Sequence, residues 1–192
     1  MKFLTGESDA PDIPERFLQD HEDGRVVFFC GAGISYPAGL PGFGELVEQV
    51  YENISFQSRS QIQQVAFKNH QYDVAISLLE SEISGGRVRK QIAEILSSPT
   101  INEKTTIMHK SLLTLSKNRY GKLRLVTTNF DRIFEHVIQE NGINRVCFVA
   151  PALPIANDEW NGLIYLHGLL REEPESEENG TRIVSSGDFG QA

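Results

Sequence analysis

Three short motifs place glycine, amide, carboxylate and imidazole groups directly after apolar runs with the composition of buried strands. The first is GAGIS (31–35), the second is TTNFD (127–131) and the third is YLHG (165–168). In an open α/β sheet, ligands bind in the crevice at the carboxyl ends of the strands. We therefore expect the three motifs to meet at one site.

The GAGIS motif has the composition of a phosphate-binding turn. Small residues let the backbone approach a phosphate, and N–H groups at the start of a helix favour its negative charge. Gly31 and Gly33 are not followed by the third glycine of the usual dinucleotide fingerprint. A plain tight turn would also explain the pair, so this motif alone leaves both interpretations open.

The other two motifs each have a structural and a chemical interpretation. Asn129 or Asp131 could cap the helix expected to start there, or either could act on a ligand. His167 could be a core histidine with satisfied hydrogen bonds, or a base that titrates near neutral pH. Neither motif decides the question alone.

The segments between the motifs predict an α/β fold. Five apolar runs are expected to form short strands, at 25–30, 122–130, 145–150, 163–167 and 181–186. The first run shows no polar–apolar alternation, so we expect it to be fully buried. Strands that alternate with helices favour a three-layer, Rossmann-like fold with a mainly parallel sheet.

Helical periodicity occupies most of the chain between the first two strands. We predict helices at 44–53, at 58–84 in two pieces divided near Asn69-His70, at 88–96 and at 107–116. Further helices are predicted before the first strand, ending at Asp20, and over 131–140. The sequence thus indicates one domain over 1–192, with a helical insertion at about 44–120.

Composition restricts the partners and the location. The net charge of −8 argues against a nucleic-acid surface, and no apolar run approaches the roughly 18 residues of a membrane span. The acidic N-terminal segment does not resemble a secretory signal. Cys30 and Cys147 lie in apolar runs without a CxxC pair, which favours buried thiols and no structural zinc site. We expect a cytoplasmic protein.

Taken together and in this order, the three motifs resemble those of the sirtuin superfamily, over about residues 25–168. The resemblance implies an NAD-binding domain in which Asn129, Asp131 and the adjoining Thr128 contact nicotinamide and ribose, while His167 acts as the base. It also implies that the NAD diphosphate is bound by the glycine turn, at Gly31, Ala32, Gly33, Ile34 and Ser35.

Two departures from the sirtuin pattern are evident. Protein-deacylating sirtuins carry a four-cysteine zinc ribbon after the catalytic histidine, whereas this chain has no cysteine after Cys147. The G-I-P-D-F-R segment of sirtuins corresponds to residues 39–44, where Phe43 is retained as an implied cofactor contact. Gly42 and Gly44 replace the Asp and the Arg. We expect this PGFG run to be conformationally free and able to close over the nicotinamide pocket, and we expect no metal.

The pattern looks more like the zinc-less sirtuin-like domains of bacterial anti-phage defence systems, which hydrolyse NAD once infection is detected. This resemblance implies an NAD+ glycohydrolase that acts as a homo-oligomer or with a fused or partner sensor subunit. An NAD-sensing module without turnover and an NAD-dependent protein deacylase are the alternatives. The ending SSGDFGQA looks like a strand followed by a helix cap, so we expect a fragment that lacks a C-terminal sensor or oligomerisation region.

Overall fold

The computed structural model describes residues 13–54, 59–83, 85–143, 146–150, 153–154 and 160–170. The expected strand at 181–186 lies outside these ranges. The elements along the chain are α1 (Glu15–Glu22), β1 (Phe28–Cys30), the 3-10 helix η1 (Ala32–Ala38), α2 (Phe43–Ile54), α3 (Gln61–Lys68), α4 (Tyr72–Glu82), α5 (Gly85–Leu96), α6 (Ile107–Leu115), β2 (Arg124–Thr127), α7 (Ile133–Glu140), β3 (Cys147–Val149) and β4 (Gly162–Tyr165).

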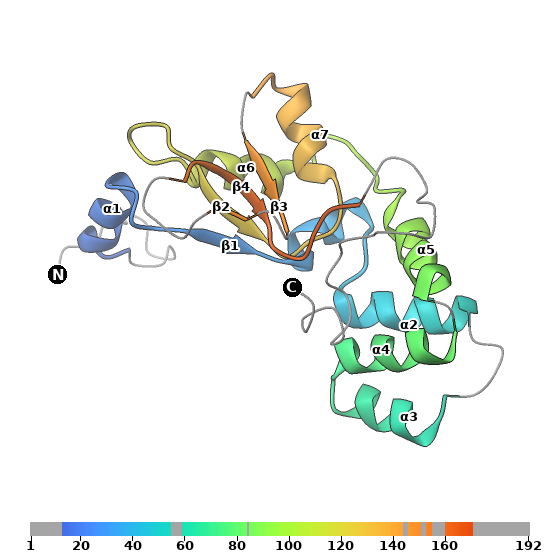
Figure 1. Ribbon diagram of the computed structural model, residues 1–192. Coiled ribbons are helices and arrows are strands. Elements are labelled where there is room, and N and C mark those ends of the chain that lie inside the picture. Colours follow the sequence, from blue (N-terminus) through green and yellow to red (C-terminus); the bar gives the residue numbers. More distant parts are fainter. Residues whose placement is uncertain are drawn as a thin grey trace, which may run out of the picture.

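The described strands form a four-stranded sheet in the order β1-β2-β4-β3, and every pairing is parallel. Helices flank this sheet and connect strands along the chain (Figure 1). The α/β class and the Rossmann-like fold predicted from the alternation of strands and helices are confirmed. Parallel neighbours need such crossover connections, because a tight hairpin can only join antiparallel strands.

The helices α6 and α7 pack against each other. In the sheet, Leu125 of β2 and Leu163 of β4 are paired neighbours, and both are fully buried. The two helices meet through the rings of His109 and Phe134, whose centroids are 4.7 Å apart at an interplanar angle of 70°. This contact brings the start of α6 to the start of α7, near the strand ends.

The helices α2 to α5 pack against one another and form a group beside the sheet (Figure 1). Their shared core consists of fully buried aliphatic side chains, among them Val47, Val50, Ala75, Ile76 and Val88. The expected helical segments match these elements closely, and the break near Asn69-His70 is the turn between α3 and α4. No helix within the described ranges is both long and apolar enough to span a membrane.

The first strand is not fully buried, contrary to the sequence prediction. The side chain of Phe29 is 63% exposed and that of Val27 is 44% exposed, whereas Cys30 is buried. The reason is position: β1 is at the edge of the described sheet. An edge strand can have the composition of a central strand while one of its faces remains uncovered.

The PGFG run is also not the free loop that its glycines suggested. Gly44 lies in the first turn of α2, and the N–H of Gly42 donates to Oε2 of Glu45 at 3.1 Å. A Cβ atom added at Gly42 would lie 2.5 Å from the hydroxyl of Tyr36, and one at Gly44 would lie 2.8 Å from the Tyr72 ring. The Tyr72 ring thus occupies the space of a side chain at Gly44, and the hydroxyl end of Tyr36 occupies it at Gly42.

Candidate functional site

The ends of the first, second and fourth strands lie side by side. The register aligns Cys30 with Thr127, and Thr127 with Tyr165. Beyond these residues the N–H of Thr128 donates to the carbonyl of Cys30 at 3.1 Å, and that of Leu166 donates to the carbonyl of Thr127 at 2.9 Å. The three motifs therefore leave the sheet from adjacent positions, as the sequence predicted.

A buried polar network joins the GAGIS motif to the TTNFD motif. The hydroxyl of Ser35 is 2.8 Å from Oδ2 of Asp131 and 3.0 Å from Nδ2 of Asn129. Nε2 of His109, from α6, approaches the same oxygen at 3.4 Å. None of these four side chains is more than 5% exposed. Ser35 thus connects three segments that are far apart in the sequence.

The hydrogen-bond capacity of a serine hydroxyl fixes the direction of these bonds. Ser35 has one proton and two acceptor lone pairs, and the Asp131 carboxylate only accepts. The proton of Ser35 therefore points to Asp131, while Asn129 Nδ2 and His109 Nε2 donate to Ser35. It follows that Asn129 Oδ1 faces away from Ser35, and this buried atom has no hydrogen-bond partner among the residues that the structure describes.

Asp131 supports the start of the helix that follows its motif, and it also joins the polar network. Its Oδ1 accepts the N–H of Ile133 at 3.1 Å, at the first residue of α7. Its Oδ2 accepts the Ser35 proton. Both carboxylate oxygens are thereby fixed, so the start of α7 and the polar network are held by one side chain.

His167 lies in the turn that follows β4. Its ring is half-buried and lies 6.2 Å from the ring of Phe130, the residue between Asn129 and Asp131. Burial lowers the pKa of His167, so the imidazole is neutral at pH 7 and can accept a proton. The structure thus brings this candidate base to the same edge of the sheet as the TTNFD motif.

The glycine turn has room on its outer side. A Cβ atom added at Gly33 would meet nothing within 4 Å, whereas one at Gly31 would lie 3.2 Å from Oγ1 of Thr128. The N–H groups of Ala32 and Gly33 lie at the start of η1, where no preceding helical turn supplies a carbonyl to accept their hydrogen bonds. These backbone donors and the missing side chain suit the close approach of an anion.

The remaining residues predicted to bind the cofactor are placed differently. The N–H of Ile34 bonds to the carbonyl of Gly31 at 3.2 Å, and its side chain packs against the core. The Ser35 hydroxyl is committed to the network, so it faces the interior. Phe43 lines a separate cavity of about 570 Å³ between η1 and the helices α2 to α4, where its ring lies edge-on to Tyr72 at 6.3 Å.

Sequence reasoning missed His109, which no motif contains. One signal was available: His109 and Leu113 are spaced i, i+4 on the buried side of α6, so an imidazole occupies a core position of an amphipathic helix. Burial lowers the pKa of His109, with a smaller opposing effect from Asp131. Its Nδ1 is buried and finds no hydrogen-bond partner within the described ranges.

No known protein-family model matches the chain. The uncharacterized protein y4cA of Sinorhizobium fredii (strain NBRC 101917 / NGR234) is 28% identical to it over 191 residues, an alignment that covers 95% of this chain. The chain spans 16% of the length of that relative.

Within the described residues, no group of His, Cys, Asp and Glu side chains is arranged to hold a metal ion.

Proposed function

We propose that this protein is an NAD+ hydrolase that cleaves the bond between nicotinamide and ribose. The observation that carries the proposal is the buried Oδ1 of Asn129, an acceptor without a partner in the described part of the chain, where three strand-end motifs meet. Leaving such an atom unpaired costs on the order of 1–3 kcal/mol. A hydrogen-bond donor on a bound substrate would recover that free energy.

The chemistry of the reaction suits the groups at this site. Cleavage develops positive charge on the ribose carbon, as in glycoside hydrolysis. Nicotinamide leaves as a neutral molecule, so no general acid is needed; the protein must position a nucleophile and supply a base. Asn129 Oδ1 would hold a water molecule or a ribose hydroxyl, and the neutral His167 would accept the proton. Asp131 would orient Asn129 through Ser35.

The glycine turn would hold the diphosphate of NAD. The open space beside Gly33 and the backbone donors of Ala32 and Gly33 support this placement. The motif resemblance further supports a role as the toxic effector of an antiviral defence system. In that role the protein would act in the cytoplasm, as an oligomer or with a sensor subunit, and without a metal.

The proposal is tested by following NAD consumption chromatographically with the wild-type chain, Asn129→Ala and the control Asn141→Ala. Asn141 is a matched control because it is an exposed asparagine at the other end of α7, whose side chain donates to the carbonyl of Val137. We expect equal release of nicotinamide and ADP-ribose by the wild type and the control. In Asn129→Ala the rate should fall by about 10²-fold or more.

Two other outcomes would favour the alternatives. NAD that binds at stoichiometric protein concentration and stays intact would indicate a sensing module. Nicotinamide release that requires an acylated peptide would indicate a deacylase. Equal hydrolysis by wild type and Asn129→Ala would remove Asn129 from the mechanism.

A further inference from the structure

We infer that His109 is a positioning residue of this site, which fixes the Asn129 amide through the hydroxyl of Ser35. The geometric part of this inference stands on the hydrogen bonds alone, whereas its effect on turnover rests on the proposed function. His109 lies on α6, outside the three motifs, and has no exposed surface. It acts through another residue.

The three partners of Ser35 use its full hydrogen-bonding capacity. His109 Nε2–H can only donate, so it excludes any arrangement in which Ser35 turns its proton toward α6. If His109 were truncated, a water molecule in its place could both donate and accept a hydrogen bond. Such a water would allow the Ser35 hydroxyl to turn its proton away from Asp131. The imidazole therefore holds the proton of Ser35 on Asp131 and the Asn129 amino group on Ser35.

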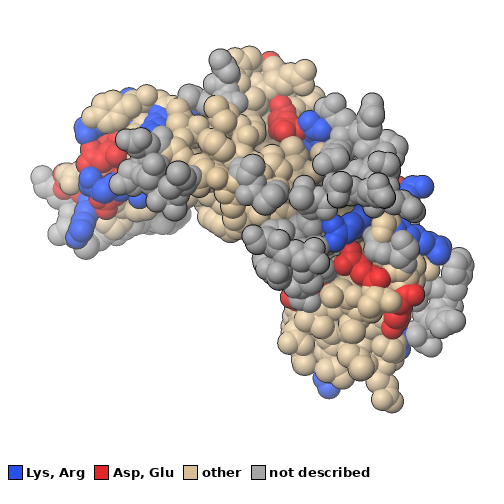
Figure 2. Space-filling view, in the orientation of Figure 1, with Lys and Arg blue, Asp and Glu red and all other residues tan. Residues whose placement is uncertain are grey.

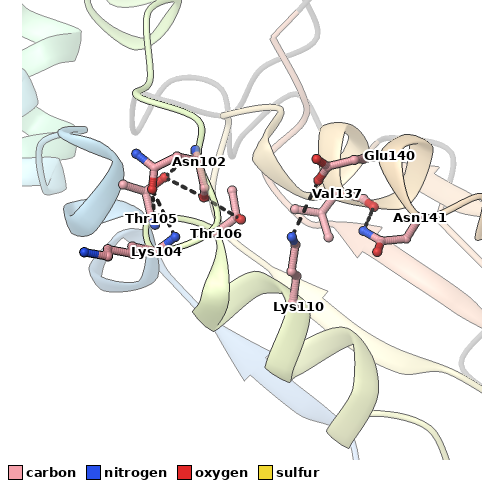
Figure 3. Close-up of polar contacts among 8 residues, drawn as sticks. All are labelled: Asn102, Lys104, Thr105, Thr106, Lys110, Val137, Glu140 and Asn141. Atoms are coloured by element: carbon pink, nitrogen blue, oxygen red, sulfur yellow. Dashed lines mark hydrogen bonds and ion pairs between the residues drawn. The ribbon is translucent and has the colours of Figure 1, made fainter.

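The start of α6 is held in place by a dense turn (Figure 3). Oδ1 of Asn102 accepts the N–H groups of Lys104 at 3.0 Å and Thr105 at 3.1 Å, and the hydroxyl of Thr106 donates to the Asn102 carbonyl at 2.8 Å. This turn ends at Thr106, immediately before α6 and three residues before His109. It leaves the imidazole little freedom to shift along the helix axis.

Two further contacts hold α6 against its neighbours. Nζ of Lys110 lies 3.6 Å from Oε2 of Glu140 on α7, as Figure 3 shows. The ring of His109 packs edge-on against the ring of Phe134, which also lies on α7. α6 thus contacts α7, the helix whose first N–H group, that of Ile133, donates to Asp131.

The segment that carries His109 also holds the far end of η1. The N–H of Thr100 donates to the carbonyl of Ala38, the last residue of η1, at 2.8 Å. His109 contacts Ser35 in the middle of the same short helix. The chain from residue 100 to 115 thus supports the glycine turn's helix at two points. Removing the contact between His109 and Ser35 should therefore disturb the geometry of the reacting groups more than the affinity for NAD.

The test compares His109→Gln, whose amide nitrogen can replace Nε2–H as a donor, with His109→Leu, which has no donor. His109→Asn is a second variant whose shorter amide does not reach Ser35, and the exposed His136→Gln is the control. We expect His109→Leu and His109→Asn to lose about 10²-fold in kcat with KM for NAD nearly unchanged. His109→Gln should stay within about tenfold of the wild type, and His136→Gln should equal it.

A readout without NAD separates this inference from the proposed function. Imidazole ¹⁵N NMR should identify His109 as the Nε2–H tautomer, and the side-chain amide protons of Asn129 should exchange slowly in the wild type and His109→Gln but quickly in His109→Leu. An Nδ1–H tautomer, or equal exchange in all variants, would overturn the inference. Wild-type protein that passes these NMR tests but leaves NAD intact would overturn only the proposed function.

Discussion

Ser35 illustrates how one side chain can have a different task from the one that its motif implies. The resemblance to sirtuins implied that all five GAGIS residues contact the NAD diphosphate. In the structure the hydroxyl of Ser35 is turned inward, where it binds Asp131, Asn129 and His109. The part of the turn left to face a phosphate is its backbone, around Gly33. Ser35 therefore links the glycine turn, which we propose holds the diphosphate, to the proposed catalytic amide.

The titration of His109 gives a pH-dependent stability. Burial lowers its pKa below the usual 6.5 in the folded protein, where it faces Ser35, Asp131 and the ring of Phe134. Below about pH 6.5 the unfolded chain binds a proton that the folded protein does not, so stability is complete above that pH and falls as the pH falls. His167 shifts in the same direction and contributes separately.

When the pH is lowered from about 7.5 to about 5.5, we expect the unfolding free energy to fall less in His109→Gln than in the wild type. Urea denaturation at both values measures this difference. His136→Gln, at an exposed position, should lose as much as the wild type. Equal losses in the wild type and His109→Gln would show that His109 carries no part of the acid sensitivity.

At the scale of the elements, periodicity predicted the α-helices α2 to α6 between β1 and β2, because an amphipathic pattern is a local property, but it did not predict the 3-10 helix η1. The position of each motif at the end of a predicted strand was enough to predict that the three motifs converge. The place of His109 in the site could not be predicted, since it depends on how α6 packs against η1. The PGFG run was misjudged because the tyrosines that pack against its glycines come from η1 and α4.

The contact between α2 and α4 gives a prediction at this scale. In Gly44→Ala the new methyl group would lie 2.8 Å from the Tyr72 ring, and we expect a loss of about 1–3 kcal/mol of unfolding free energy. Urea denaturation measures this loss, with Gly33→Ala as the control because its methyl group meets nothing within 4 Å. Combining Gly44→Ala with Tyr72→Leu should recover part of the loss; equal effects of the two alanine variants would contradict the packing argument.

At the scale of the whole molecule, charge and burial are unevenly distributed. In Figure 2 acidic and basic side chains gather together over α1 and over the α2–α5 group, while the middle of this face carries few charges. Around α1 the signs compensate, because Arg25 pairs with Asp20 and Asp23, and Arg119 pairs with Asp23. The described residues of this face form no extended basic surface, in keeping with the net charge of −8.

The two faces of the sheet differ in how well they are covered. Phe29, Val126 and Ile164 are register neighbours and therefore share one face. Ile164 in β4 is buried on this face, Val126 in β2 is partly buried, and Phe29 in the edge strand is 63% exposed. Exposure thus increases toward β1. Strand composition alone could not predict this gradient, because the edge and the centre of the sheet use the same apolar residues.

This gradient predicts that two phenylalanines contribute very unequally to stability. Phe29→Ala removes a mostly exposed ring, so its unfolding free energy should change by no more than about 0.5 kcal/mol. Phe134→Ala removes a fully buried ring between α7 and His109 and should cost about 3–5 kcal/mol. Urea denaturation of both variants measures the difference. A comparable loss in Phe29→Ala would mean that its ring is covered in solution, and would contradict the open face described for β1.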